Sequence, residues 1–468
     1  MVGERPTIVV KYGGSSLAEP KDFHAVAAHQ RGLYESGLLP VAVNSARKGA
    51  SDRLLGVWRG NARLADYIGD ESAFYADGVF AGRPDRDPFM EDLRGHFAKV
   101  RQVMEAGSGQ YPDTHRESIL LADGEAEAGL ALQHLMRDFM PGLRFMDGRE
   151  AGVVAKSMRG PVDIKASVRN IREGKGDGDV SYGGFVGRDP ANPEHSMLLD
   201  RNSTDLTAAL VAAALRAREY RNVKDVDGVM ICDPRVCDGD GPPRIIEMLS
   251  YAEAADITRG GSPVIHPAAL IVSEGYGVRI RITSLGNKGG TLISAASGTT
   301  LEKPYAAISS LHAVCATVED KAMDIPNQGR GYAADVMRIL ADSGYDILNI
   351  TGPGTAMSVV VAGGSEVSKG KGADVGEVCS ALTQGLRQRD RDGTVRAREI
   401  GYISITGAAM RGRPGTWRQI ADVISGEGIN LSMVGQGDEA FIETPVVSFC
   451  VDTRDYGRAV NALRKKLF

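Results

Sequence analysis

The chain has 468 residues, of which 43% are hydrophobic, 25% are charged and 6% are aromatic, and its formal net charge is −5. This composition is typical of a globular protein, and the length allows two to four domains. No block of basic residues stands out, which argues against a nucleic-acid partner. The segment before Pro6 is polar and no apolar run is long enough to cross a bilayer, so we expect neither a signal peptide nor contact with a membrane.

The cysteines are few and scattered, at positions 232, 237, 315, 379 and 450. Cys232 and Cys237 have no second cysteine pair and no histidine cluster beside them, so we predict no zinc site and no metal-binding residues. We expect all five to be reduced thiols in a cytoplasmic protein.

The first predicted strand leads into a candidate phosphate site. Residues 7–10 form an apolar run that suits a central strand, and Lys11 follows at its carboxyl end, where ligands bind in open α/β sheets. Gly13 and Gly14 allow a ligand to approach the backbone, and Ser16 offers a hydroxyl group. Two interpretations remain open: a phosphate cradle with Lys11 as its counter-charge, or an ordinary strand–turn–helix with a snorkelling lysine.

Up to about residue 290, apolar strands alternate with helical patterns. We predict strands at 38–46, 180–187 and 278–284, and helices at 117–138 and 204–219. Strands separated by helices indicate a parallel α/β sandwich. The segment 286–294 is predicted to end this domain.

A second pattern follows, and it occurs twice. The segments 331–350 and 415–434 each contain a helix, a turn with glycine and a strand. Each is followed by a further strand, at 358–363 or 446–452, and by a helix, at 375–387 or 455–467. We interpret them as two βαββα modules of the size of a small ligand-binding unit. The alternative is two unrelated α+β units.

Several segments resemble a known family when they are taken in order. They are KYGGSS (11–16), NSA (44–46), GE (124–125), RNSTD (201–205), KDVDGVMICDPR (224–235), LSYAEA (249–254) and VIHP (264–267). This order resembles the aspartate kinases of the amino-acid kinase superfamily, and the C-terminal repeat resembles their paired ACT regulatory modules. The resemblance implies an α/β fold: a three-layer αβα sandwich over 1–295, then two ferredoxin-like (βαββαβ) ACT modules at 300–395 and 396–468. The strand at 306–311 is expected to complete the second module.

The resemblance also implies a reaction. Such an enzyme phosphorylates the side-chain carboxylate of L-aspartate with ATP and forms 4-phospho-L-aspartate. The acceptor carboxylate is already ionised at neutral pH and needs no general base, so catalysis consists of positioning and charge neutralisation. Mg²⁺ is expected to arrive with ATP and to be held mostly by phosphate oxygens.

Residues of this sequence match the family's site positions one by one. Lys11 and Asp205 match the catalytic pair, although Asp205 also suits an ordinary helix N-terminus. Arg201 matches the residue that holds the α-carboxylate of the substrate, and Glu125 matches the partner of its ammonium group. Glu125 is alternatively a solvated acid on a Glu-rich helix. The remaining expected substrate contacts are Ser45, Ser51 and Thr204.

The expected nucleotide and effector contacts complete the implied sites. The nucleotide-binding residues are expected to be Lys11, Gly13, Gly14, Ser16, Lys224, Asp225, Met230 and Arg235. An amino-acid effector, if one binds, is expected at the interface of the ACT modules near Asp346, Asn349 and Ile350.

The sequence departs from the family mainly around the nucleotide. A glycine-rich family loop becomes the segment 200–205, in which three glycines are lost; Asn202 is the best non-glycine residue for a positive φ there. Pro263 stands where the family has a lysine that reaches ATP, and Lys224 is a candidate to replace that charge. The acceptor end of the site is kept better.

Three functions stay open on this basis. The first is an aspartate kinase, with a diverged paralogue of altered nucleotide site as one form of it. The second is a phosphotransferase that acts on another amino acid. The third is a non-catalytic amino-acid sensor. We also expect a homodimer or larger homo-oligomer joined through residues from about 300 to 468, because the predicted strands at 429–433 and 446–451 carry no lysine or proline to protect an exposed edge.

Overall fold

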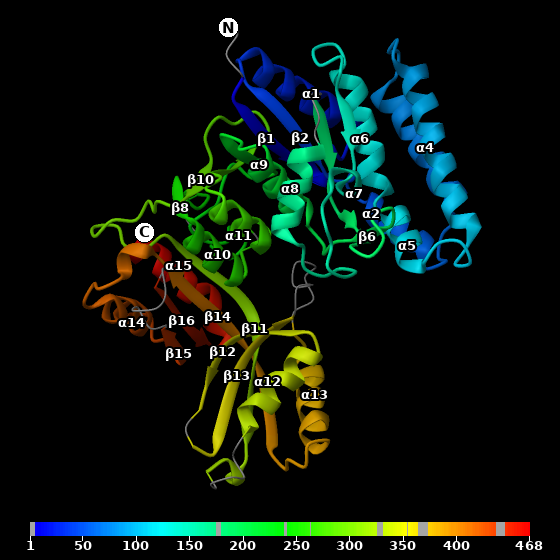
Figure 1. Cartoon of the computed structure of the whole chain (residues 1–468). Helices are drawn as coiled ribbons and strands as arrows, with labels where there is room; N and C mark the ends of the chain where they lie inside the picture. Colours follow the sequence, from blue (N-terminus) through cyan, green and yellow to red (C-terminus); the bar gives the residue numbers. More distant parts are fainter. Residues whose placement is uncertain are drawn as a thin grey trace. The chain divides into compact units, whose positions relative to one another are not determined.

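The computed structural model describes residues 5–174, 179–237, 241–262, 264–324, 331–352, 354–363, 373–436 and 445–468 (Figure 1). Two compact units are present, and each is described by itself. The first contains Met1–Val229 and Ile265–Ala296, and the second contains Met230–Val264 and Ser297–Phe468. The domain boundary expected near residue 295 stays a prediction, and the segment Met230–Val264 groups with the C-terminal residues.

The first unit is built on a mainly parallel sheet, as the alternation of strands and helices predicts. Its strands lie in the order β3-β4-β2-β1-β7-β9-β10. The apolar run of β1 is buried, since β1 pairs in parallel with both β2 and β7. Strand β10 runs antiparallel to its neighbour β9. The strands are β1 (Thr7–Tyr12), β2 (Leu39–Asn44), β3 (Arg144–Met146), β4 (Val180–Gly183), β7 (Glu219–Lys224), β9 (Ile280–Ser284) and β10 (Thr291–Ser294), with a separate hairpin of β5 (Val186–Arg188) and β6 (Ser196–Leu198).

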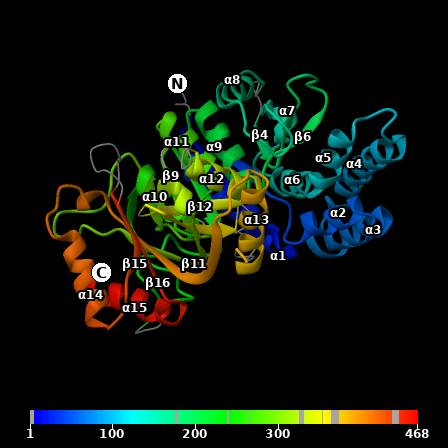
Figure 2. The same ribbon diagram turned by 90° about the horizontal axis from the view of Figure 1, so that it is seen from below.

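Helices cover this sheet and form the outer layers of a three-layer αβα sandwich, as predicted. Helices α1 and α6 contact each other and β2, while α9 contacts β1, β7, α8 and α11. Both views show α4 and α5 beside each other (Figures 1 and 2), and Figure 1 shows them away from β1 and β2. The helices of the unit are α1 (Pro20–Glu35), α2 (Ala50–Trp58), α3 (Leu64–Ala73), α4 (Arg86–Ala106), α5 (Asp113–Leu121), α6 (Asp123–Met136), α7 (Gly148–Ala151), α8 (Ile164–Gly174), α9 (Thr204–Ala214) and α11 (Pro267–Gly275), with a 3₁₀ turn η1 (Gly14–Leu17) and a π-helical turn η2 (Phe74–Val79).

Two predicted helices have different limits in the structure. The single helix predicted at 117–138 is two helices, α5 and α6, which meet at Ala122, whose φ and ψ of −91° and 1° interrupt the helical geometry. The helix predicted at 204–219 ends at Ala214, because Arg216 takes a positive φ of 50° and the chain turns into strand β7. Within the described residues, no helix is both long enough and apolar enough to cross a membrane.

The second unit contains an antiparallel sheet in the order β12-β13-β11-β14-β16-β15. Strands β11 and β14 pair with each other over their full lengths, from Ala307 opposite Thr406 to Glu319 opposite Thr394. The elements are β8 (Met248–Ser250), α10 (Tyr251–Arg259), β11 (Ala307–Glu319), η3 (Lys321–Asp324), α12 (Tyr332–Asp342), β12 (Tyr345–Thr351), β13 (Ala356–Gly363), α13 (Val375–Arg387), β14 (Thr394–Thr406), η5 (Ala408–Met410), α14 (Thr416–Gly426), β15 (Ser432–Gln436), β16 (Val446–Val451), η6 (Thr453–Asp455) and α15 (Tyr456–Leu467).

Two helix pairs pack on this sheet and confirm the predicted repeat. One core joins α12 and α13 to the second half of β11, with Val314 and Val318 at its centre. The other core joins α14 and α15 to the first half of β11, with Ile308 and Phe449 among its buried residues. Each half therefore repeats helix, strand, strand, helix.

The prediction that 446–451 is an exposed edge is wrong. Strand β16 lies between β14 and β15 and pairs with both, because β15 adds to its outer side. The outer strands are β12 and β15, and they contact each other: Asn349 Nδ2 donates a hydrogen bond to the Met433 carbonyl oxygen at 3.0 Å.

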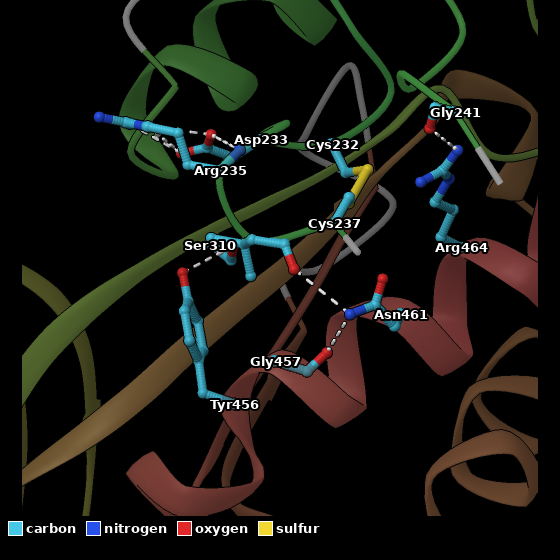
Figure 3. Close-up of a disulfide and its surroundings, with 11 residues drawn as sticks. Cys232, Asp233, Arg235, Cys237, Gly241, Ser310, Tyr456, Gly457, Asn461 and Arg464 are labelled. Atoms are coloured by element: carbon cyan, nitrogen blue, oxygen red, sulfur yellow. Dashed lines mark hydrogen bonds and ion pairs between the residues drawn. A yellow bond between two sulfur atoms is a disulfide. The ribbon is translucent and has the colours of Figure 1, made fainter. Parts of the chain in front are cut away.

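The expectation of reduced thiols is wrong for one pair of cysteines. Cys232 and Cys237 form a disulfide, shown in Figure 3, and their Cα atoms lie 6.7 Å apart. The turn between them brings the sulfurs together, since the N–H groups of Val236 and Cys237 both donate to the Asp233 carbonyl oxygen at 3.0 Å. Helix α15 supports this loop through Asn461, whose Nδ2 donates to the Val236 carbonyl oxygen at 3.3 Å. The other three cysteines are free, as expected.

Candidate active site

Two lysines and one aspartate meet at the carboxyl ends of β1 and β7. Lys11 Nζ lies 2.9 Å from Asp205 Oδ1, and the two side chains are only 12% and 7% exposed. Burial raises the pKa of Asp205, but the charges of Lys11 and Lys224 outweigh burial and hold that pKa below its usual value. Burial lowers the pKa of Lys224. The backbone N–H of His266 donates to Asp205 Oδ2 at 3.2 Å, so Asp205 is fixed from two sides.

The glycines after β1 are required by the space around them. A Cβ atom on Gly13 would lie 3.3 Å from Lys11 Nζ, and a Cβ atom on Gly14 would lie 3.0 Å from the Ala46 carbonyl oxygen. The Ser16 N–H closes the turn by donating to the Gly13 carbonyl oxygen at 2.9 Å. Any side chain here would displace the amine or the neighbouring loop, so the turn keeps an open backbone surface beside Lys11.

A buried carboxyl group lies on the other side of the loop that contains Ala46. Glu125, in the first turn of α6, is 5% exposed, and burial raises its pKa to about 8. The Ala46 N–H donates to this carboxyl group, which lowers the pKa only in part. Glu125 Oε2 has no hydrogen-bond partner among the described residues. A buried acceptor without a partner is costly, and a cationic ligand group would satisfy it.

Close packing sets the position of Glu125. A Cβ atom on Gly124 would lie 2.8 Å from the Ala46 Cβ and 3.1 Å from the Ala50 Cβ, so only glycine lets α6 begin this close to the loop. Asn44 Nδ2 donates to the Glu125 carbonyl oxygen at 2.8 Å. The same loop places two of the predicted substrate contacts. Ser45 is half-buried after β2, and Ser51 lies in the first turn of α2.

The loop before α9 takes the conformation that its asparagine suits. Asn202 has a positive φ of 62°, which Asn tolerates better than other non-glycine residues. Arg201 is 41% exposed, and its Nη2 lies 3.7 Å from Asp52 Oδ1, which is itself 78% exposed. An exposed pair of this kind contributes little, so the guanidinium can exchange it for a ligand carboxylate. Thr204 is buried at the first turn of α9.

The predicted nucleotide contacts fall in both units. Lys11, Gly13, Gly14, Ser16, Lys224 and Asp225 belong to the first unit, and Asp225 is exposed. Met230 and Arg235 belong to the second unit. Arg235 is 82% exposed, and Asp233 Oδ2 holds its Nη2 at 2.7 Å. The roles of these residues stay predictions.

The predicted effector residues lie on β12. The Asn349 side chain bonds to β15 as described above, burial raises the pKa of Asp346, and Ile350 is 42% exposed. These observations leave the effector role a prediction.

Sequence reasoning missed several residues that shape the site. His266 lies within VIHP and Asn44 within NSA. Neither motif by itself indicates that the His266 N–H bonds to Asp205 or that the Asn44 side chain bonds to the Glu125 carbonyl oxygen. The contacts of Glu71 with Arg47 and Arg53 have no sequence signal, because they depend on how α3 packs beside the loop before α2. Within the part of the chain that the structure describes, no cluster of acidic, histidine or cysteine side chains could hold a metal ion by itself.

Two relatives match almost the whole length of the chain. The chain is 23% identical to aspartokinase 3 of Bacillus subtilis over 475 aligned residues, which cover 98% of each protein. It is also 23% identical to an aspartokinase of Mycolicibacterium smegmatis, with 98% of this chain and 95% of that protein covered.

Solved structures give the same fold. Aspartokinase III of E. coli in complex with aspartate and ADP matches with a TM-score of 0.75 at 21% identity, covering 99% of this chain and 100% of that one. The same enzyme in complex with lysine and aspartate matches with a TM-score of 0.76 at 22% identity, covering 99% of both chains. The family models for the amino acid kinase family and the ACT domain match residues 6–284 and 403–467. The chain therefore belongs to the amino acid kinase family and carries an ACT domain near its C-terminus.

Proposed function

We propose that this protein is an ATP-dependent aspartate kinase, which transfers the γ-phosphoryl group of ATP to the side-chain carboxylate of L-aspartate. One observation carries the proposal: a cationic phosphate end and a carboxylate end of one site share the residue Ala46. Its carbonyl oxygen faces Gly14 beside Lys11, and its N–H bonds to Glu125. A substrate that lies along this loop would have its reacting carboxylate near Lys11 and its ammonium group near Glu125.

The residues at the phosphate end suit phosphoryl transfer. The acceptor is an ionised carboxylate, so no group must remove a proton from it. The charges of Lys11 and Lys224 stabilise the negative charge on the transferred phosphoryl oxygens, and Asp205 holds Lys11 in place. Mg²⁺ bound to ATP would neutralise phosphate charge, and its ligands would come mostly from phosphate oxygens.

The residues at the other end suit an α-amino acid. Glu125 Oε2 is buried without a partner in the described part of the chain, and the substrate ammonium group supplies one. Among the residues that the structure describes, the Arg201 guanidinium has a weak contact with Asp52 to give up, and it can bind the α-carboxylate with two hydrogen bonds. Ser45 and Ser51 belong to the segment 45–53 and Thr204 begins α9, and their hydroxyl groups are proposed as further contacts of the substrate. The names of the relatives support aspartate as the amino acid.

The C-terminal modules are proposed to bind an amino-acid effector and to join copies of the chain. One of the similar aspartokinase III structures is a complex with both lysine and aspartate, which supports an effector of this class. Ile350 on β12 and Val434 on β15 are exposed apolar residues, at 42% and 49%, on strands that contact each other. A second copy that covers them would bury this surface, so light scattering of the full chain at micromolar concentration should give a mass of at least two chains.

The activity is tested directly by trapping the acyl phosphate. The protein is incubated with ATP, Mg²⁺, hydroxylamine and one amino acid at a time, and hydroxamate and ADP are both measured. Aspartate is expected to give equal amounts of the two. Lys11→Ala serves as the control for contaminating kinases. Hydroxamate from a different amino acid would indicate the second function left open by the sequence, and a folded protein that forms none with any amino acid would indicate a sensor.

A further inference from the structure

A fully buried carboxylate holds the loop that joins the two ends of the site. Glu71 on α3 is 0% exposed. Arg47 donates from Nε to Glu71 Oε2 at 2.6 Å and from Nη2 to Oε1, and Arg53 donates from Nη1 to the same Oε1 at 2.7 Å. Both arginines come from the segment 45–53, which also contains Ser45 and Ser51. One carboxylate therefore fixes this segment at two points.

Aromatic rings extend the contacts of this group to helix α6. The Arg47 guanidinium lies 4.4 Å from the centre of the Phe74 ring, and the Arg53 guanidinium lies 5.0 Å from the centre of the Tyr67 ring. The Tyr67 hydroxyl donates to Glu127 Oε1 at 2.8 Å, on the same helix as Glu125. The segment 45–53 is thus held against the helix that carries the predicted ammonium partner.

The residue that precedes Arg47, Ala46, is the one shared by both ends of the site. Ala46 donates its N–H to Glu125 and turns its carbonyl oxygen toward Gly14, where a Cβ atom would come within 3.0 Å. A shift of Arg47 therefore moves the backbone between the phosphate loop and Glu125. A displacement of about 1 Å at a site of this kind costs up to about a hundredfold in rate.

We propose that Glu71 is a positioning residue: through Arg47 and Arg53 it sets the position of the segment 45–53 and thereby the affinity for the acceptor amino acid. This inference rests on the proposed function, because it assigns that acceptor to the site. Glu71 lies on α3, and its role is exerted through the two arginines. Its negative charge matters because two guanidinium groups converge on one buried acceptor.

The first test compares kinetic constants of matched variants. Arg53 is 36% exposed, so the fold of Arg53→Ala should survive, although the change removes the bond to Glu71, the pair with Asp70 at 2.6 Å and the contact with the Tyr67 ring. We expect its KM for aspartate to rise roughly tenfold, with KM for ATP within about twofold of the wild type. Arg53→Lys, which keeps the charge, should restore part of the loss. Arg63→Ala is the control, since Arg63 is 81% exposed and its ion pair within the described part of the chain is with the exposed Asp66, at 2.7 Å and 2.9 Å.

The second test does not require activity. Hydrogen exchange of the backbone amides of 45–53 is measured without substrate in the wild type, Glu71→Gln, Arg53→Ala and Arg63→Ala. Faster exchange in Glu71→Gln and Arg53→Ala but not in Arg63→Ala, together with the selective rise in the KM for aspartate, supports the inference. Unchanged exchange or unchanged aspartate KM in folded variants overturns it, as does an equal rise in both KM values. If the wild type does not phosphorylate aspartate, the proposed function fails, and exchange alone decides whether Glu71 holds the segment.

Discussion

The raised pKa of Glu125 predicts how the affinity for aspartate depends on pH. Burial places this pKa at about 8 in the absence of a ligand, so the carboxyl group is mostly protonated at neutral pH. The ammonium group of the substrate binds the ionised form, because it needs an acceptor with a negative charge. Binding must therefore release a proton at pH 7, and the affinity must increase as the pH rises.

The expected size of the effect follows from the pKa. The ionised fraction is about one-tenth at pH 7 and about one-half at pH 8, so the apparent Kd should fall roughly fivefold over this interval. The number of protons released should be about 0.9 at pH 7 and about 0.5 at pH 8. Isothermal titration calorimetry in two buffers with different ionisation enthalpies measures both quantities in one set of experiments.

Glu125→Gln is the matched control for this experiment. The amide keeps the shape of the side chain but cannot ionise, so the variant should bind aspartate weakly and with the same Kd at both pH values. A wild-type protein that binds aspartate without proton release at pH 7 would refute the reasoning, because Glu125 would then be ionised already or would not contact the ammonium group. A pH dependence that persists in Glu125→Gln would assign it to another residue.

Further predictions concern the phosphate end, the substrate carboxylate and the disulfide. Lys11→Ala should lower kcat about a hundred- to a thousand-fold without loss of the folded circular dichroism spectrum, since it removes one preorganised charge; wild-type turnover would contradict the role of this lysine. Arg201→Lys should raise the KM for aspartate far more than that for ATP, because an ammonium group cannot form the paired hydrogen bonds of a guanidinium; the opposite split would mean that the two ends of the site are exchanged. Denatured without reductant, the protein should take up three alkylating groups, and five after reduction, by mass spectrometry, because Cys232 and Cys237 are bonded and three cysteines are free; five groups without reductant would exclude the bond.

Local signals made much of the fold predictable from the sequence. The apolar run of β1 and the limits of α13 were both predicted, since each has a clear pattern of its own. The break at Ala122 was not predicted, because the apolar pattern of 117–138 continues through it without a proline. Glu125 lies in the first turn of α6, directly after this break. Its position depends on the packing of α6 against the loop that contains Ala46, and the apolar pattern of the sequence does not predict that packing.

The candidate site was predictable only where residues matched a family. The ion pair of Lys11 with Asp205 follows from motifs that lie far apart in the chain, and the resemblance joins them. The contacts of Glu71 with Arg47 and Arg53 depend on how α3 packs beside the loop, and no spacing rule predicts them. The disulfide was not predicted, because an isolated pair of cysteines has no disulfide framework around it in the sequence. The bond depends on the turn at Asp233, which brings Cys232 and Cys237 together.

The full-length pairing of β11 with β14 limits how the C-terminal modules can move. At the usual rise per residue the two strands form a ribbon roughly 40 Å long. Ile308 faces one helix pair and Val314 faces the other, and both lie on the same side of this ribbon. Sliding one strand by a single residue would turn its apolar side chains to the wrong face, so the ribbon resists shear and can only twist or bend. A ligand that tilts one helix pair relative to the other must therefore twist or bend this ribbon, and the second module, which takes the first half of β11, cannot be excised as one continuous piece of chain.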